Sequence, residues 1–320
     1  MKITKQTLIL FIVSPLFFLW SYFLLTHYTR GDQGHYWRFY QSLQGAPLSD
    51  LMSLAMSYVS SCEPVIAIVL WVGANLGIEK NIYISMFNVL FFCGIILLLK
   101  KYKVPWYIYF FIFTNFYFIV LMTAAERLKF AYILLTYSAL FSTKKAFFWA
   151  LLSPLAHLQS FILLASAGMA KYSESIKMLI VRFRIRKMDF LSLTIALILS
   201  GICLFFLWEG VFRKALWYTE RYGGLSELVS VFILLVATMT ATKNRFRVLI
   251  AFIPIIVTIY FLGGMRVNMI AVTIFFYLML IEGRLTHPVA ICLLMYFSVK
   301  SIPFVYNIIT YGSGFAGFLF

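Results

Sequence analysis

The chain has 320 residues, of which 63% are hydrophobic and only 12% are charged, and its formal net charge is +16. Soluble domains carry about 25% charged residues, so this composition excludes an ordinary soluble domain and indicates a polytopic membrane protein. The basic excess lies in short loops between apolar runs. It therefore indicates membrane orientation and contact with anionic headgroups, and argues against a nucleic-acid-binding protein.

The apolar runs are continuous and close to the length of about 20 residues that a membrane-spanning helix needs. We therefore expect an all-α polytopic membrane protein, with residues 1–320 forming a single integral membrane domain of about nine transmembrane helices. The expected spans are residues 7–26, 82–99, 105–122, 129–142, 190–208, 225–242, 247–262, 268–281 and 288–306.

Two apolar regions are broken and too short on each side of the break for a simple crossing. Residues 51–78 are interrupted at Ser60-Ser61-Cys62-Glu63-Pro64, and residues 146–170 are interrupted at Ser153-Pro154. Proline kinks or ends a helix, and pieces this short are typical of segments that re-enter the membrane. We predict that both regions are re-entrant hairpins.

The distribution of charge sets the expected orientation, with the N-terminus in the cytoplasm. If both hairpins return to the side from which they start, the cytoplasmic loops hold 17 of the 27 Lys and Arg residues, but only Glu174, Asp189 and Glu282 among the acidic ones. This bias agrees with the positive-inside rule. The basic segment 171–187 is interpreted as an interfacial segment that contacts anionic membrane lipids.

The first loop on the outer side interleaves charged and aromatic residues. Asp32 lies close to Tyr36, Trp37 and Tyr40. Aromatic rings stack on the apolar faces of sugars and carboxylates accept hydrogen bonds from sugar hydroxyls, so this loop is a candidate carbohydrate surface. The alternative is an aromatic belt at the membrane interface, which accounts for the rings but does not require Asp32.

Three further candidate site residues are ionisable side chains that interrupt or head apolar runs. An ionisable group at membrane depth indicates function. Glu63 precedes Pro64 at the first break and is either a general base or the cap of the helix that Pro64 begins. Arg127 follows Glu126 at the head of a span, as a phosphate ligand or as half of a structural ion pair. His157 follows the second break, as a proton acceptor or as a hydrogen-bonded packing residue.

Two more arginines occupy glycine-containing interruptions on the outer side. Arg221-Tyr222 precedes Gly223-Gly224, and Arg266 follows Gly263-Gly264. Because the planar guanidinium binds phosphate through two parallel hydrogen bonds, arginines at several outer span ends favour a pyrophosphate site. Tyr222 is a further candidate for sugar contact.

The chain contains no P-loop, GxGxxG, HExxH, GxSxG or Asp-x-Asp motif, and its cysteines have no metal-ligand spacing. We therefore expect no metal and no cofactor. An activated donor that is already attached to a lipid on the outer side fits the sequence better than a cytoplasmic nucleotide sugar.

Several of these features together resemble the EpsG-like branch of the bacterial Wzy-type O-antigen and exopolysaccharide polymerases. They are Asp32 with Tyr36 and Tyr40, Glu63-Pro64 before an apolar run, Arg127 opening a span, His157-Leu-Gln-Ser160, and Arg266 late in the chain. The resemblance runs from about residue 8 to residue 285. The chain departs from the expected pattern at Val65, where we would expect glycine after the proline.

The resemblance implies a GT-C-like glycosyltransferase of the bacterial inner membrane that joins repeat units carried on undecaprenyl pyrophosphate at the periplasmic face. By analogy, Arg127, Arg221 and Arg266 hold the leaving pyrophosphate, where negative charge develops. Glu63, Asp32 or His157 takes the proton from the acceptor hydroxyl.

The partners that the resemblance implies are the lipid-linked donor and acceptor glycans, membrane lipids and a chain-length regulator, with no nucleic acid. A ligase-type transferase that moves glycan to another acceptor is a close alternative. A flippase of lipid-linked oligosaccharide would predict internal symmetry, which the sequence does not show. A structural subunit of an envelope assembly would tolerate replacement of the outer arginines.

Overall fold

In the computed structural model, the described residues are 5–141, 143–184, 228–262 and 264–316, with isolated positions between 189 and 216. Every regular element in these residues is a helix, and they contain no β-strand, in agreement with the all-α prediction. The chain forms two compact units, Met1–His157 with Leu293–Phe320, and Leu158–Cys292.

The first unit contains α1 (Lys5–His27), α2 (Asp32–Ser42), a short 3-10 turn (Leu48–Asp50), α3 (Leu51–Val59), α4 (Pro64–Asn75), α5 (Lys80–Lys101), α6 (Trp106–Phe113), α7 (Phe116–Thr123), α8 (Glu126–Leu140), α9 (Thr143–Ala156) and α16 (Pro288–Tyr311) from Leu293 onward. The second unit contains α10 (Ser160–Lys171), α11 (Ser173–Arg182), α13 (Leu228–Ala241), α14 (Arg245–Leu262) and α15 (Gly264–Ile281). Of the expected span 190–208, only isolated positions fall within the described residues.

Among the described residues, α5 and α16 are long and apolar enough to cross a membrane. Two bent pairs, α3 with α4 and α6 with α7, raise the number of candidate spans to four if each pair counts as one. These helices fit an α-helical membrane protein. Several of the other expected spans correspond to shorter apolar helices such as α13.

The apolar run 105–122 forms two helices, α6 and α7, with a bend of 53° between them. Asn115 causes the break, because its side chain accepts a hydrogen bond from the backbone N–H of Tyr117 at 2.9 Å and so caps α7. A side chain that bonds its neighbouring backbone offers the chain an alternative to the continuous helix. The expected span is therefore divided near its middle.

The second predicted break lies at a different place from the one that the sequence indicates. Helix α9 continues through Pro154 and ends at Ala156. Proline cannot donate to the carbonyl four residues earlier, but Ser153 Oγ donates to that carbonyl, on Ala150, at 2.8 Å. The hydroxyl replaces the missing hydrogen bond, so the helix continues and the break moves to residues 157–159.

The core between α1, α5 and α7 is built from stacked aromatic rings. The rings of Phe17 and Phe92 stack with centroids 4.0 Å apart, and those of Phe91 and Phe118 stack at 5.3 Å. A buried polar ladder lies in the same region, where Asn88 Nδ2 donates to Ser21 Oγ at 2.7 Å. Lipid tails are as apolar as the helix surfaces, so the hydrophobic effect does not drive helices together in a membrane. Packing contacts and hydrogen bonds between helices of this kind hold them together instead.

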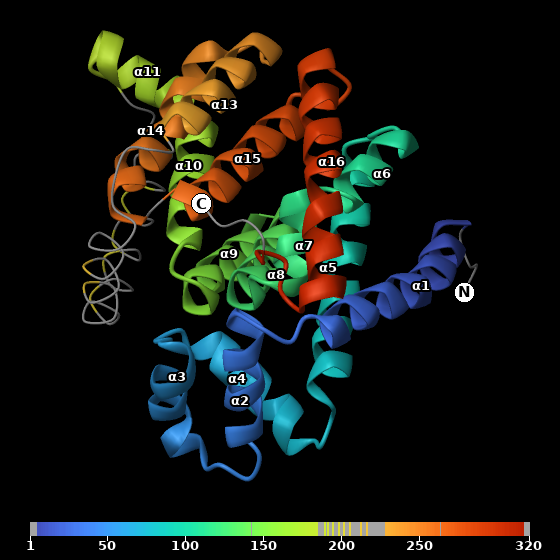
Figure 1. Cartoon of the computed structure of the whole chain (residues 1–320). Coiled ribbons are helices and arrows are strands. Elements are labelled where there is room, and N and C mark those ends of the chain that lie inside the picture. The colour runs from blue at the N-terminus through green and yellow to red at the C-terminus, as the bar shows by residue number, and fades with distance from the viewer. Residues whose placement is uncertain are drawn as a thin grey trace. The chain divides into compact units, whose positions relative to one another are not determined.

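Helix ends of the first unit gather at two opposite places. At one, Thr29 and Arg30 donate backbone hydrogen bonds to Gly312 O, which joins the end of α1 to the end of α16. The start of α5 meets the start of α8 there through Lys80 and Glu126. We call this the site end, and Figure 1 shows α2, α3 and α4 grouped beyond the ends of α1 and α5. At the opposite end of the first unit, Lys101 Nζ donates to Ala139 O, which joins the last turns of α5 and α8.

In the second unit, three segments that the charge pattern assigns to the cytoplasm lie together. Lys243 N donates to Glu282 Oε2 at 3.0 Å, and Arg247 Nη1 lies 3.4 Å from Glu282 Oε1. Asn244 Nδ2 donates to Glu174 at 2.8 Å. The start of α11, the connection from α13 to α14 and the end of α15 therefore share one end of this unit.

Candidate active site

Glu63 lies at the break between α3 and α4, whose axes differ in direction by 103°. The break follows from Ser60, which ends α3 in the left-handed conformation (φ 48°), and from Pro64 at the first position of α4. Glu63 occupies the N-cap position, yet its side chain makes no capping hydrogen bond. The capping interpretation is therefore wrong, and the carboxylate has other partners.

These partners come from three separate parts of the first unit. Arg127 Nη1 lies 3.3 Å from Glu63 Oε2, and His157 Nδ1 lies 3.0 Å from Oε1. Ser61 Oγ also donates to Oε2, and it accepts a hydrogen bond from the Glu63 backbone N–H at 3.2 Å. The Glu63 side chain is fully buried, whereas the side chains of Arg127 and His157 are 15% and 10% exposed.

Tyr36 of α2 completes this group. Its hydroxyl accepts a hydrogen bond from Arg127 Nε at 3.0 Å. Burial raises the pKa of Tyr36 to about 12, so the phenol stays protonated at neutral pH and acts as a neutral acceptor. We call Tyr36, Ser61, Glu63, Arg127 and His157 the Glu63 centre. Arg127 is thus oriented by one neutral and one acidic oxygen.

A second buried group lies beside the first. Lys80 Nζ donates to Glu126 Oε1 at 2.9 Å and to Gln33 Oε1 at 2.7 Å, and Gln33 Nε2 donates to the same Glu126 oxygen at 2.7 Å. Gln33 Nε2 also donates to Thr123 O. Lys129, fully buried, interacts electrostatically with both Glu126 and Lys80. We call Gln33, Lys80, Glu126 and Lys129 the lysine network.

The two groups are joined through consecutive residues on α8. Glu126 bonds to the lysine network, and Arg127 bonds to the Glu63 centre. Each of the two neighbours is therefore half of an ion pair, with a partner from another part of the first unit. An ionisable side chain held at the end of apolar helices, among other polar groups, marks a functional region by default.

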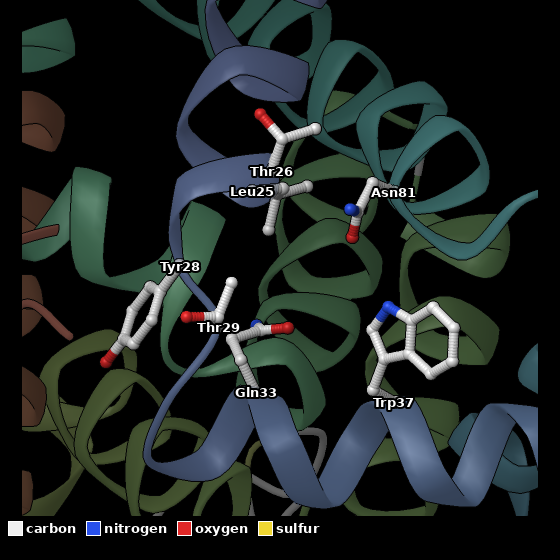
Figure 2. Close-up of a pocket in the computed structure, with 7 residues that line it drawn as sticks. All are labelled: Leu25, Thr26, Tyr28, Thr29, Gln33, Trp37 and Asn81. Carbon is white, nitrogen blue, oxygen red and sulfur yellow. The ribbon is translucent and has the colours of Figure 1, made fainter. Parts of the chain in front are cut away.

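A cavity of about 270 Å³ opens at the site end, next to the lysine network. Figure 2 shows Trp37 and Gln33 reaching toward it from α2, Thr26 from the last turn of α1, and Asn81 from the first turn of α5. Trp37 is 45% exposed.

The structure brings together four of the predicted site residues, namely Tyr36, Glu63, Arg127 and His157. Asp32 lies exposed in the first turn of α2 and influences Tyr36 electrostatically. Tyr40 is 7% exposed and donates its hydroxyl to Ile78 O at 2.8 Å, which anchors α2 to the end of α4. Arg221, Tyr222 and the side chain of Arg266 lie outside the described residues.

Sequence reasoning missed Gln33, Lys80 and Ser61. Lys80 stands two residues before the apolar run 82–99, so it could have been recognised as a cation at the outer end of a span. Gln33 lies three residues before Tyr36 and shares a face of α2 with it, but this segment was expected to be a loop, so the spacing gave no signal. Ser61 had no signal of its own, because its role depends on the turn that directs its hydroxyl toward Glu63.

The Glu63 centre can hold an anion and move a proton. When Nδ1 of His157 donates to the carboxylate, the neutral ring carries its lone pair on Nε2, which is the tautomer of a general base. Arg127 offers a delocalised charge that matches phosphate oxygens. Within the described ranges, no three His, Cys, Asp or Glu side chains are grouped to hold a metal ion.

Comparison of the chain with protein-family models, curated proteins and solved structures found no match.

Proposed function

We propose that the chain is a membrane glycosyltransferase that polymerises oligosaccharide repeat units carried on undecaprenyl pyrophosphate, at the periplasmic face of a bacterial inner membrane. The observation that carries the proposal is the convergence of Arg127, Glu63 and His157 at the end of apolar helices. Such a group combines a cation for a leaving phosphate with a candidate base. Both lie in a largely buried setting, where electrostatic stabilisation is strong.

The reaction assigns one role to each group. The acceptor hydroxyl oxygen attacks the anomeric carbon of the donor sugar, and the bond from that carbon to the pyrophosphate oxygen breaks. The hydroxyl proton passes to His157, and the bonding electrons leave with the undecaprenyl pyrophosphate. Arg127 stabilises the negative charge on this leaving group. Glu63 is a positioning residue, since it holds both the guanidinium and the imidazole ring.

Glu63 and the substrate would also compete for Arg127. The guanidinium donates to Tyr36 through Nε and to Glu63 through Nη1. A phosphate that approaches the exposed part of Arg127 would share the guanidinium with the carboxylate. Arg221 and Arg266 are proposed as further pyrophosphate ligands, and Asp32 as a contributor from the rim.

The proposed architecture is GT-C-like, with about nine spans, two re-entrant hairpins and a cytoplasmic N-terminus. Two observations support it. The break before α4 and the break after α9 meet through Glu63 and His157, as discontinuous helices meet at the sites of other membrane proteins. The basic cluster at Lys100–Lys103 begins at the end of the first unit opposite to the site end.

Cysteine labelling tests this orientation. After the native cysteines are replaced, Ser49→Cys in the α2–α3 connection should react with a membrane-impermeant maleimide in intact cells. Lys103→Cys, beyond the end of α5, should react only after lysis. Both positions are exposed, so burial does not bias the comparison. The opposite pattern would place the Glu63 centre in the cytoplasm and contradict the proposed donor.

Surface glycan from a complemented deletion strain tests the activity. Arg127→Ala and His157→Ala should insert normally but give single-unit glycolipid instead of long chains. Arg127→Lys should also fail, since a single ammonium cannot replace the fork between Tyr36 and Glu63. Arg38→Ala on the exposed face of α2 is the matched control and should give a normal ladder. Normal ladders from all four variants would refute the assigned roles.

The same experiment separates the alternatives. If the chain were a flippase, its inactive variants would leave the glycolipid on the cytoplasmic side. If it is a polymerase, they should expose single units on the periplasmic side. If it were a ligase-type transferase, they would leave polymer that is still attached to undecaprenyl pyrophosphate.

A further inference from the structure

The cavity at the site end has walls of two kinds. Leu25 and Gln33 are buried and form its floor, while Thr26, Thr29 and Trp37 are exposed and form its rim. Tyr28 is buried too, and Figure 2 shows its ring pointing away from the other lining residues. Asn81, which is half-buried, contributes an amide from the start of α5. The lining therefore contains two aromatic residues, of which only Trp37 is exposed, one leucine, hydroxyls and amides, but no charged side chain.

The floor is rigid because Gln33 is held on both sides of its amide group. Its carbonyl oxygen accepts from Lys80, and its amide nitrogen donates to Glu126 and Thr123 O. Fully bonded polar groups of this kind fix a surface in one arrangement. The lysine network thus supports the cavity from below, and this use of three buried charged residues is not required by the Glu63 centre itself.

The size and chemistry of the cavity restrict its ligand. A volume of about 270 Å³ lies just below the range of roughly 300–1,000 Å³ that holds drug-sized molecules. This is room for one small ring and not for an oligosaccharide. A neutral lining with one exposed indole matches a ligand that has an apolar face and several hydroxyls, which is the chemistry of a pyranose.

The cavity is coupled to the Glu63 centre through two helices. On α2, Gln33 and Trp37 line the cavity, while Tyr36 bonds to Arg127. On α8, Glu126 holds Gln33, and the next residue, Arg127, holds the Glu63 carboxylate. A ring seated against Trp37 therefore lies beside the turn of α2 that positions the proposed phosphate ligand.

We propose that this cavity is the subsite for one neutral sugar ring of the lipid-linked glycan, with Trp37 as the stacking platform and Asn81 and Thr29 as hydrogen-bonding partners. This inference rests on the proposed function. It adds the position of the sugar, and it assigns the lysine network the task of holding the floor of the subsite.

The test measures binding by the full-length chain in lipid nanodiscs, using native mass spectrometry. Two probes are compared: undecaprenyl pyrophosphate carrying the repeat unit extracted from the deletion strain, and undecaprenyl pyrophosphate alone. Trp37→Ala should weaken binding of the glycosylated lipid about tenfold and leave binding of the bare lipid unchanged, because only the sugar contacts the ring. Trp37→Phe should retain most of the affinity.

Two controls keep the result specific. Trp106→Ala removes an 82% exposed tryptophan from the start of α6 and should change neither affinity. Thr26→Trp fills the rim of the cavity and should weaken binding of the glycosylated lipid until its affinity equals that of the bare lipid. Because Trp37 and Thr26 are both exposed, their replacement should not prevent folding.

The outcomes separate this inference from the function on which it rests. Equal binding of the glycosylated lipid by the wild type, Trp37→Ala and Thr26→Trp would overturn the subsite while leaving the polymerase proposal intact. Failure of the wild type to bind either lipid would overturn the proposed function, and the subsite with it. If Trp37→Ala weakened binding of both lipids equally, the indole ring would contact the lipid or the pyrophosphate and not the sugar. This result would also overturn the subsite.

Discussion

We predict that replacing Glu126 and replacing Lys80, the two partners of the buried ion pair in the lysine network, will lower stability by different amounts. Lys80 contacts Glu126 directly, and the fully buried Lys129 interacts electrostatically with both residues. Lys80→Met leaves Lys129 as a basic group near the carboxylate. Glu126→Gln instead leaves both buried lysines without this carboxylate. We therefore expect Glu126→Gln to be the more destabilising change, although both break the same 2.9 Å contact.

The magnitude follows from the burial of the pair. At 2.9 Å, and with an effective dielectric constant of about 20, the attraction between Lys80 and Glu126 is on the order of 6 kcal/mol before the cost of desolvation is subtracted. Removal of one partner from a buried pair typically costs about 3–5 kcal/mol. We expect Glu126→Gln to lower the free energy of unfolding by this amount, and Lys80→Met by about 1–3 kcal/mol because Lys129 still interacts electrostatically with the carboxylate.

The assay is reversible unfolding in mixed micelles, followed by far-ultraviolet circular dichroism as the mole fraction of SDS rises. Lys177→Met is the matched control, because it makes the same substitution at an exposed lysine of α11. It should change the free energy of unfolding by less than about 1 kcal/mol. A Lys80→Met variant that is as unstable as Glu126→Gln, or two variants no less stable than Lys177→Met, would refute the reasoning.

Three further predictions concern single contacts. Tyr36→Phe removes the acceptor of Arg127 Nε and should slow polymerisation roughly tenfold without preventing insertion, which a time course of ladder growth would detect. Gly73→Ala places a Cβ atom 2.5 Å from the ring of Tyr83 and should cost about 1–3 kcal/mol, whereas Gly168→Ala has open space and should be neutral or stabilising in the same unfolding assay. Burial raises the pKa of Tyr28 and Tyr36 from 10.0 to about 12, so their contribution to stability is complete below pH 10 and is lost as the pH rises to about 12. Unfolding measured from pH 9 to pH 12 should show this loss, and Tyr36→Phe should reduce its slope.

Much of the candidate site could be predicted from the sequence because a charge between apolar runs is conspicuous. Glu63, Arg127 and His157 each interrupt or head such a run, and the energy needed to keep an ionisable group there makes an accidental occurrence improbable. The same reasoning predicted the helical class and the break before Pro64, since proline at the first position of a helix is a local signal.

The partners of these residues could not be predicted, because they depend on which helices pack together. The pairing of Glu126 with Lys80, 46 residues away, arises when the starts of α5 and α8 meet at the site end. The function of Glu63 as the centre of a cluster, in place of a helix cap, likewise depends on the approach of α8 and α9. Sequence spacing contains no record of such contacts.

The sequence by itself determined the helical membrane class, the charge asymmetry between loops and the residue types available for chemistry, because these follow from composition and from the local rules of helix formation. Two helix breaks also have local causes, which only the structure revealed. Asn115 divides an apolar run by capping α7, and Ser153 lets α9 continue through a proline by bonding the carbonyl of Ala150. Tertiary structure alone decided that four separated segments place Tyr36, Glu63, Arg127 and His157 in one cluster, since only packing brings distant charges within bonding distance.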